Sequence, residues 1–256
     1  SLSCQSQVLP GAENTKQYIK LLNGKNIGVV AHQASLISTS DKNIHLVDAL
    51  LNEKINVEKV FAPEHGFRGT ADAGEKIENQ IDTTTKLPII SLYGKNRKPT
   101  NEQLEGIDIM VFDLQDVGVR FYTYLSTLHY VMEACAENNI PLIVLDRPNP
   151  NAHYVDGPVL EKEHTSFVGM HPVPIVYGMT IGEYAQMING EKWLTNEINC
   201  DLTVIPIQNY THSTPYKLPI RPSPNLPNVK SISLYPSLCL LEPTVISVGR
   251  GTAIQF

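Results

Sequence analysis

The chain has 256 residues, of which 42% are hydrophobic and 18% charged, and 20 basic against 26 acidic residues give a net charge of −6. This is the composition of an ordinary globular protein and it excludes intrinsic disorder. The negative charge without a Lys/Arg-rich face argues against nucleic acid as a partner, and no apolar run reaches the roughly 18–20 residues of a transmembrane span.

Short apolar runs rich in β-branched residues alternate with helical patterns over the first 150 residues. We expect helices over 43–53 and 124–138, and strands at 26–31, 57–62, 87–92, 107–114 and 140–145. Continuous apolar strands of this kind are typical of a parallel sheet with helices on both faces. The sequence therefore predicts an α/β fold: a Rossmann-like parallel sheet flanked by helices, followed by the start of a second, smaller α+β subdomain.

The pattern changes after residue 151. A helix is expected over 179–193, with Thr180 as its N-cap and Glu183 completing a capping box, followed by a short strand at 202–205 and a proline-rich stretch. We expect three parts: a leader over 1–19, a Rossmann-like domain over 20–155, and an incomplete second subdomain over 156–256. The residues around Cys4 are similar to the end of a bacterial lipoprotein signal, and they also fit a chance match.

Chemically active side chains follow the ends of the predicted strands. In a parallel sheet these ends share one edge, where ligands bind. The residues that we expect at this edge are Glu64, His65, Arg68, Asp116, Arg120, Tyr122, Tyr124, Asp146 and Asn149.

Glu64 is the most specific local signal, because it follows a buried strand and a proline and precedes His65 and Gly66. A carboxyl group placed in the crevice can act as a general acid. The alternative, a structural clamp with Arg68 or Arg120, fits the same position equally well. Asp116 is likewise open to a catalytic or a structural role.

The other residues at this edge suggest a polar, ring-shaped ligand. Arg120 with Tyr122 and Tyr124 combines a cation with aromatic rings, which suits a sugar acid. Their structural alternative is a pair of tyrosines half-buried at a helix start. Asp146 and Asn149 lie in a proline-rigid turn and could bind hydroxyl groups. Glu242 and Arg250 suggest a second polar cluster near the end of the chain.

Several signatures are missing from the sequence. There is no GxGxxG, GxxxxGK[ST], GxSxG or HExxH motif, and the four cysteines form no CxxC pair. We therefore expect no cofactor and no metal site, and the missing glycine fingerprint disfavours a nicotinamide-dependent enzyme.

Taken together, the motifs resemble those of the NamZ-type exo-β-N-acetylmuramidases over about residues 20–256. The resemblance rests on the segments 62–69, 113–124, 146–150, 155–158, 178–183, 222–225 and 249–252. The family usually has His where this chain has Tyr177, and Gly where it has Pro243. Members usually continue into a further subdomain beyond the point at which this sequence stops.

The resemblance implies release of N-acetylmuramic acid from the non-reducing ends of peptidoglycan fragments, in a cleft between two subdomains. Glu64 would be the acid/base, with His65 beside it. Asp116 would be the second carboxylate or would orient the acetamido group, and Arg120 or Arg68 would bind the lactyl carboxylate. Retention, inversion and substrate-assisted attack remain open. So does a non-catalytic role as a muropeptide-binding module.

The partners implied are peptidoglycan-derived saccharides. Because peptidoglycan lies outside the cytoplasmic membrane, we expect a periplasmic or secreted protein. A lipid attached to Cys4 would anchor it to the membrane surface.

Overall fold

The computed structural model describes residues 7–38, 43–68, 80–249 and 252, and the predicted residues Cys4 and Arg250 lie outside this part of the chain. Its centre is a twisted seven-stranded sheet in the order β5-β6-β4-β1-β7-β8-β9. All neighbouring strands are parallel except β5, which runs antiparallel to β6. The strands are β1 Asn26–Ala31, β4 Asn56–Ala62, β5 Gln80–Ile81, β6 Pro88–Ser91, β7 Ile109–Asp113, β8 Leu142–Leu145 and β9 Leu202–Ile205.

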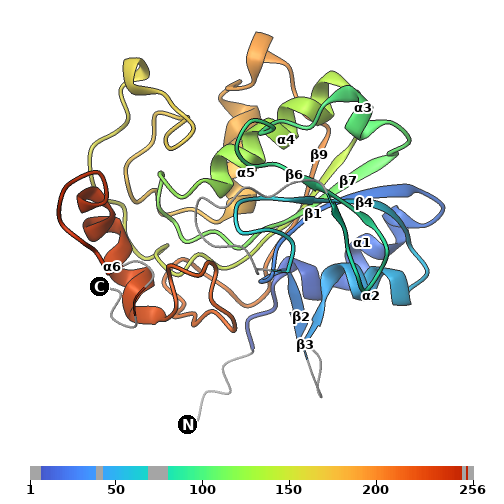
Figure 1. The fold of residues 1–256 in the computed structure, drawn as a ribbon, viewed down its shortest axis with the longest axis horizontal. Coiled ribbons are helices and arrows are strands. Elements are labelled where there is room, and N and C mark those ends of the chain that lie inside the picture. The colour runs from blue at the N-terminus through green and yellow to red at the C-terminus, as the bar shows by residue number, and fades with distance from the viewer. Residues whose placement is uncertain (1–6, 39–42, 69–79, 250–251, 253–256) are drawn as a thin grey trace.

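Helices cover both faces of the sheet. On one face lie α1 (Thr15–Leu22) and α2 (Leu46–Asn52), and on the other lie α3 (Asn101–Leu104), α4 (Tyr124–Glu137) and α5 (Ile181–Gly190) (Figure 1). Each face has its own apolar core: Tyr18 and Leu50 belong to the first, and Leu128 and Tyr184 to the second. Because the central strands are buried on both faces, their sequences are continuously apolar.

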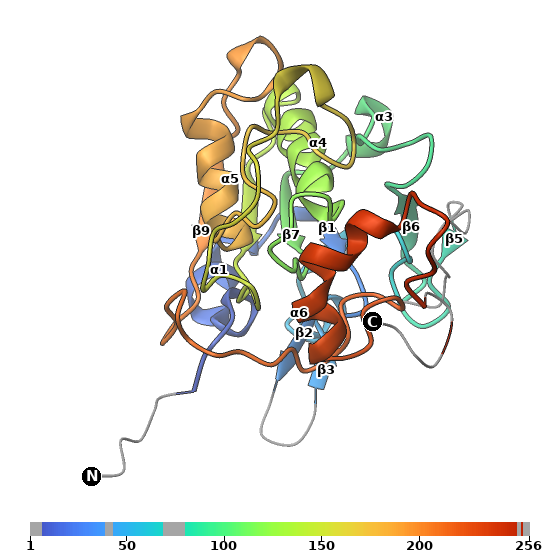
Figure 2. The same ribbon diagram turned by 90° about the vertical axis from the view of Figure 1, so that its left-hand side faces the viewer.

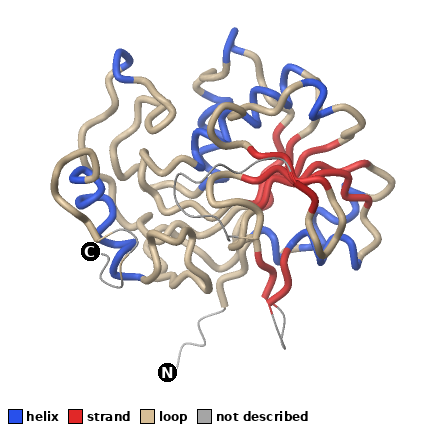
Figure 3. The backbone as a smooth tube through the Cα atoms, viewed as in Figure 1, coloured by secondary structure: helices blue, strands red, loops and turns tan. Residues whose placement is uncertain are grey.

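Smaller elements complete the described part of the chain. A two-stranded antiparallel sheet pairs β2 with β3. The helix α6 stands away from the main sheet, and long loops fill the space between them (Figure 3). The bounds are β2 Leu36–Ser38, β3 Asn43–His45, α6 Val229–Leu238, and the 3₁₀ turns η1 Gly11–Glu13, η2 Lys162–His164, η3 Thr195–Glu197 and η4 Cys239–Leu241.

The structure confirms the predicted α/β class and its mostly parallel sheet. The helix predicted over 43–53 was wrong at its start, where residues 43–45 form β3. His45 explains the boundary: its Nδ1 accepts a hydrogen bond of 3.2 Å from the Val47 amide and so caps α2. The capping box predicted for α5 is present, with Thr180 and Glu183 in the expected roles.

Two elements are arranged differently from what the sequence pattern suggested. Helix α1 begins within the stretch 1–19 predicted as a leader and continues to Leu22. Its Tyr18 is buried and donates a hydrogen bond of 2.7 Å to the Ala12 carbonyl. Strand β9 follows the predicted domain boundary at residue 155, yet it pairs with β8 in the main sheet. In the part of the chain that the structure describes, no helix combines the length and apolar character needed to cross a membrane.

Candidate active site

A cavity of about 830 Å³ opens beyond the carboxyl ends of β4, β6 and β7. The loops after these strands line it, together with residues 166–168, residues 223–226 and the segment from α6 through η4. Figure 2 views the molecule from this side and shows α6 in front of the sheet. The lining residues used below are Glu64, His65, Tyr93, Arg97, Phe121, Tyr122, Thr123, Tyr124, Phe167, Asn225, Tyr235 and Glu242.

The position of the cavity follows from the strand order. Successive crossovers from β1 run outward through β4 to β6 on one side, and through β7 to β8 and β9 on the other. The loops after β1 and β7 therefore leave the sheet in opposite directions and open a crevice between them. In open α/β sheets ligands bind at this switch point, and the cavity lies beside it.

Glu64 lies at the cavity wall two residues after β4 ends, and its side chain is half-buried. Its Oε2 lies 3.5 Å from Thr123 Oγ1, at the start of α4. The carboxyl group thus stands where two strand-end loops meet. It can reach a ligand in the cavity, as a general acid must.

The loop that carries Glu64 has an unusual backbone. His65 has φ 73° and Gly66 has φ 77°, so two successive residues are in the left-handed region. Gly66 tolerates this conformation, whereas a non-glycine residue there costs free energy. Such strain persists where the surroundings impose it, often at functional sites. Here it turns the chain sharply, with the Gly66 amide donating to the Pro63 carbonyl at 3.1 Å.

Tyr124 connects the cavity to the buried end of β1. Its hydroxyl lies 3.1 Å from Nδ1 of His32, and Nε2 of His32 accepts a hydrogen bond of 3.0 Å from the Gln115 amide. Because Nε2 is an acceptor, Nδ1 carries the proton and donates it to Tyr124. Burial lowers the pKa of His32, so the imidazole is neutral. Burial and the nearby Glu64 carboxylate raise the pKa of Tyr124, which keeps its hydroxyl protonated.

Asp116 does not line the cavity. It is buried, and its Oδ2 accepts hydrogen bonds from the Gly118 amide at 2.6 Å and from the Tyr177 hydroxyl. Burial raises the pKa of Asp116 to about 6, although both hydrogen bonds act in the opposite direction. The structure therefore favours the structural alternative for Asp116, which holds the loop after β7 against the segment before α5.

The two arginines expected to bind a carboxylate are already engaged. Arg68 forms ion pairs with Asp48 at 3.1 Å and Asp82 at 3.0 Å. Burial alone would raise the pKa of Asp82. Hydrogen bonds from Arg68 and Thr85 outweigh this effect and lower the pKa to about 2. Arg120 donates through Nη1 to the Pro158 carbonyl at 2.8 Å and to the Val173 carbonyl. Neither arginine lines the cavity.

Asp146 and Asn149 hold loops together instead of facing this cavity. Asp146 accepts hydrogen bonds of 2.8 Å from both Thr180 Oγ1 and the Gly182 amide, and so caps α5. Burial raises the pKa of Asp146 to about 6. Asn149 donates to the Met179 carbonyl at 2.8 Å and is buried. Asp146 lines a separate surface pocket of about 400 Å³.

Five predicted residues do meet at the cavity: Glu64, His65, Tyr122, Tyr124 and Glu242. Arg97 and Phe167 line the same cavity and were not among the residues predicted from the sequence. Arg97 comes six residues after the end of β6, in the loop that follows this strand. A search of longer strand-end loops would have found Arg97, whereas nothing in the sequence pattern marks Phe167.

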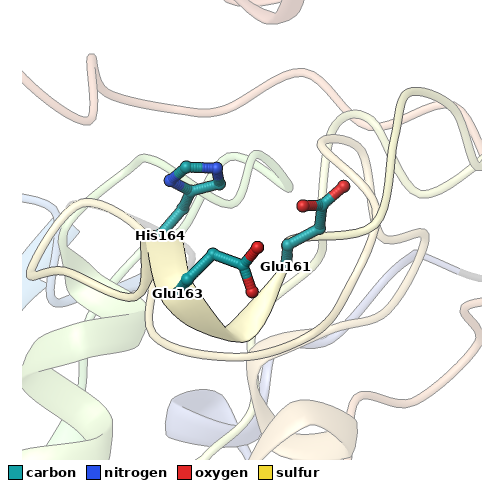
Figure 4. Close-up of side chains that lie close together, drawn as sticks. All are labelled: Glu161, Glu163 and His164. Atoms are coloured by element: carbon teal, nitrogen blue, oxygen red, sulfur yellow. The ribbon is translucent and has the colours of Figure 1, made fainter.

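Three groups that can bind a metal gather elsewhere on the surface. Glu161, Glu163 and His164 at η2 have ligand atoms within 4.8 Å of one another (Figure 4). All three are exposed, and exposed acidic groups commonly cluster in this way without an ion. They do not line the cavity, and we assign no metal site to them.

The fold and the site together define a class: a Rossmann-like α/β protein with an aromatic-lined cavity that holds carboxyl groups at the sheet's switch point. The chain belongs to the family described as Exo-beta-N-acetylmuramidase NamZ, N-terminal, whose model matches residues 27–230. Family membership agrees with the resemblance found in the motifs.

The chain is similar to one curated protein and to two proteins of known structure. The peptidoglycan beta-N-acetylmuramidase NamZ of Bacillus subtilis (strain 168) is 47% identical over 245 residues, covering 93% of this chain and 58% of the relative. A crystal structure of a DUF1343 family protein from Bacteroides fragilis NCTC 9343 matches with a TM-score of 0.87 and 49% identity, covering 98% of this chain and 66% of that one. A second such protein from the same organism has a TM-score of 0.87 and 37% identity, with 97% and 64% covered. The chain thus spans under two thirds of each relative's length.

Proposed function

We propose that the protein is a glycoside hydrolase that releases N-acetylmuramic acid from the non-reducing ends of peptidoglycan fragments. The observation that carries the proposal is the position of Glu64 at the wall of an 830 Å³ cavity, within residues 27–230 that the family model matches. A cavity of this size suits a monosaccharide unit and part of its neighbour.

Glu64 is the proposed general acid. Its proton passes to the glycosidic oxygen as the bond from C1 to that oxygen breaks, and water or the acetamido group supplies the new bond at C1. Thr123 Oγ1 lies 3.5 Å from the carboxyl group, and Tyr124 follows it at the start of α4 and lines the same cavity. Glu242, at the end of η4, is the second carboxyl group that lines the cavity among the described residues. We assign to Glu242 the stabilisation of positive charge at C1.

The walls of the cavity fit a sugar. Tyr93, Phe121, Tyr122 and Tyr235 present aromatic surface, and Asn225 adds an amide. Tyr122 and Tyr235 lie with ring centres 6.1 Å apart in an edge-to-face arrangement. Apolar walls with a few polar groups are the usual form of a small-ligand site.

The test is release of free N-acetylmuramic acid from a muramic-acid-terminated disaccharide and from a chromogenic muramide, followed by mass spectrometry and absorbance. Glu64→Gln should lower kcat by roughly 100- to 10,000-fold, the usual contribution of a general acid. Glu53→Gln, an exposed carboxyl at the end of α2, is the matched control and should retain activity.

Two other results would change the assignment. Full activity of Glu64→Gln would move the acid to another group, with Glu242 tested next. Binding of the sugar without any release by the unaltered protein would support a muropeptide-binding module instead of an enzyme.

A further inference from the structure

We propose that Arg97 is the specificity-determining residue that binds the lactyl carboxylate of N-acetylmuramic acid. This inference rests on the proposed function, because it names the group that would recognise the substrate's negative charge. Within the described residues, Arg97 is the one arginine or lysine that lines the cavity.

Two other cations near this edge of the sheet, Lys98 and Arg147, are already paired with carboxylates. Lys98, the next residue, forms ion pairs of 2.7 Å with Glu133 and Glu137. Arg147 is paired with Asp113 in the core. Arg97, by contrast, makes no ion pair with any residue that the structure describes. Its charge is therefore available to a ligand.

The orientation of Arg97 is set by two contacts that leave its outer nitrogens available. Its Nε donates to the Gly94 carbonyl at 3.1 Å, and its guanidinium carbon lies 4.1 Å from the centre of the Phe167 ring. In the described structure, Nη1 and Nη2 make no hydrogen bond. A stacked guanidinium with two unused nitrogens on one edge matches the geometry of a carboxylate.

The platform under Arg97 is itself held in place. The Phe167 carbonyl accepts a hydrogen bond of 2.5 Å from Ser126 Oγ, and the Phe167 ring stacks on Tyr130 with an interplanar angle of 17°. Both partners belong to α4, the helix that begins beside Glu64. The helix that begins beside Glu64 therefore also supports the platform under Arg97.

The electrostatics of the cavity require such a cation. Two acidic residues, Glu64 and Glu242, line the cavity, and Arg97 is the arginine or lysine that lines it among the described residues. One bidentate arginine offsets the repulsion between these carboxyl groups and an anionic sugar, and places the sugar's carboxylate. The same arrangement would select N-acetylmuramic acid over N-acetylglucosamine, which has no lactyl group.

The experiment compares binding of N-acetylmuramic acid and its methyl ester by calorimetry, together with kcat and KM for the chromogenic muramide. The unaltered protein should bind the acid roughly 10- to 100-fold more tightly than the ester, the worth of a charge-assisted pair. Arg97→Met should remove this preference and raise KM by a similar factor with little change in kcat. Arg97→Lys should retain part of the preference for the acid over the methyl ester.

Lys95→Met is the matched control, because Lys95 is exposed in the same loop and does not line the cavity. It removes the same charge and should leave the preference intact. A thermal unfolding curve for each variant verifies that the fold is retained.

The possible failures are distinguishable. If the unaltered protein prefers the acid and Arg97→Met still does, the assignment of Arg97 is overturned while the proposed function stands. If acid and ester bind equally well to an active protein, carboxylate recognition is overturned. If the protein neither binds nor cleaves the muramide, both proposals fall.

Discussion

Asp113 and Arg147 form a buried, bidentate ion pair that joins the carboxyl ends of β7 and β8. Arg147 Nε lies 2.5 Å from Asp113 Oδ1, and Nη2 lies 2.8 Å from Oδ2. Nη2 also donates to the Leu36 carbonyl of β2 at 3.1 Å. The pair thus ties the small two-stranded sheet to the edge of the main sheet beside the cavity.

Removing one partner of this pair should be strongly destabilising. Arg147→Met leaves a buried carboxyl group without its cation, which typically costs about 3–5 kcal/mol of unfolding free energy. Urea unfolding followed by circular dichroism measures the loss. Lys192→Met breaks a pair whose side chains are 60% and 72% exposed and should cost under about 1 kcal/mol. If both variants lose the same unfolding free energy, the buried ion pair contributes no more to stability than the exposed one.

Gly118 should be intolerant of any side chain. It has φ 80°, and a methyl group there would overlap the side-chain amide of Asn149. Gly106 has the same φ but open space around it, so Gly106→Ala reports the backbone cost alone, about 1 kcal/mol. Gly118→Ala should cost about 1–3 kcal/mol more. Similar midpoints in urea for the two variants would contradict the predicted overlap.

Stability should fall as the pH rises from about 4 to about 6. The pKa of Asp116 is about 6 in the folded protein and about 3.9 when unfolded. In this window the folded state therefore keeps a proton that the unfolded state releases. The two-unit difference corresponds to on the order of 3 kcal/mol. Asp146, with a pKa also raised to about 6, contributes in the same window.

Asp116→Asn should therefore flatten about half of this pH dependence, measured as urea midpoints at pH 4, 5, 6 and 7. Asp201→Asn, at an exposed carboxyl, should keep the full slope. Asp82 affects stability in a different pH range, because its pKa is lowered to about 2. Its contribution to the stability of the fold is complete above about pH 4 and is lost as the pH falls through about 2. If stability depends on pH in Asp116→Asn as it does in the unaltered protein, Asp116 does not hold the proton that the folded state retains.

Substituting Arg68 should lower stability without changing KM, and substituting Arg97 should raise KM without changing stability. Arg68→Met removes ion pairs to Asp48 and Asp82 and should cost about 1–3 kcal/mol of stability, with KM for the muramide unchanged. Arg97→Met should raise KM and leave the unfolding midpoint in place. Unfolding curves and steady-state kinetics on both variants test this. A raised KM in Arg68→Met alone would assign the carboxylate site to Arg68, one of the two arginines predicted for it from the sequence.

Much of the architecture could be predicted because it depends on local pattern. Val29 and Val111 lie in continuous apolar runs, and burial on both faces of a parallel sheet requires such runs. Glu64 and Tyr124 could be placed at one edge for a similar reason, since the carboxyl ends of parallel strands share an edge. The order of the strands could not be read from these runs, because every run is apolar enough to occupy a central position.

The sequence by itself determined the fold class, the family and the edge of the sheet where the chemistry gathers. Only the tertiary structure decided which charged side chains are available. Arg68, Arg120 and Asp116 look as reactive in sequence as Arg97, yet the first three are occupied by partners from distant segments. A side chain's availability depends on pairs between residues far apart in the chain, and no local pattern encodes those pairs.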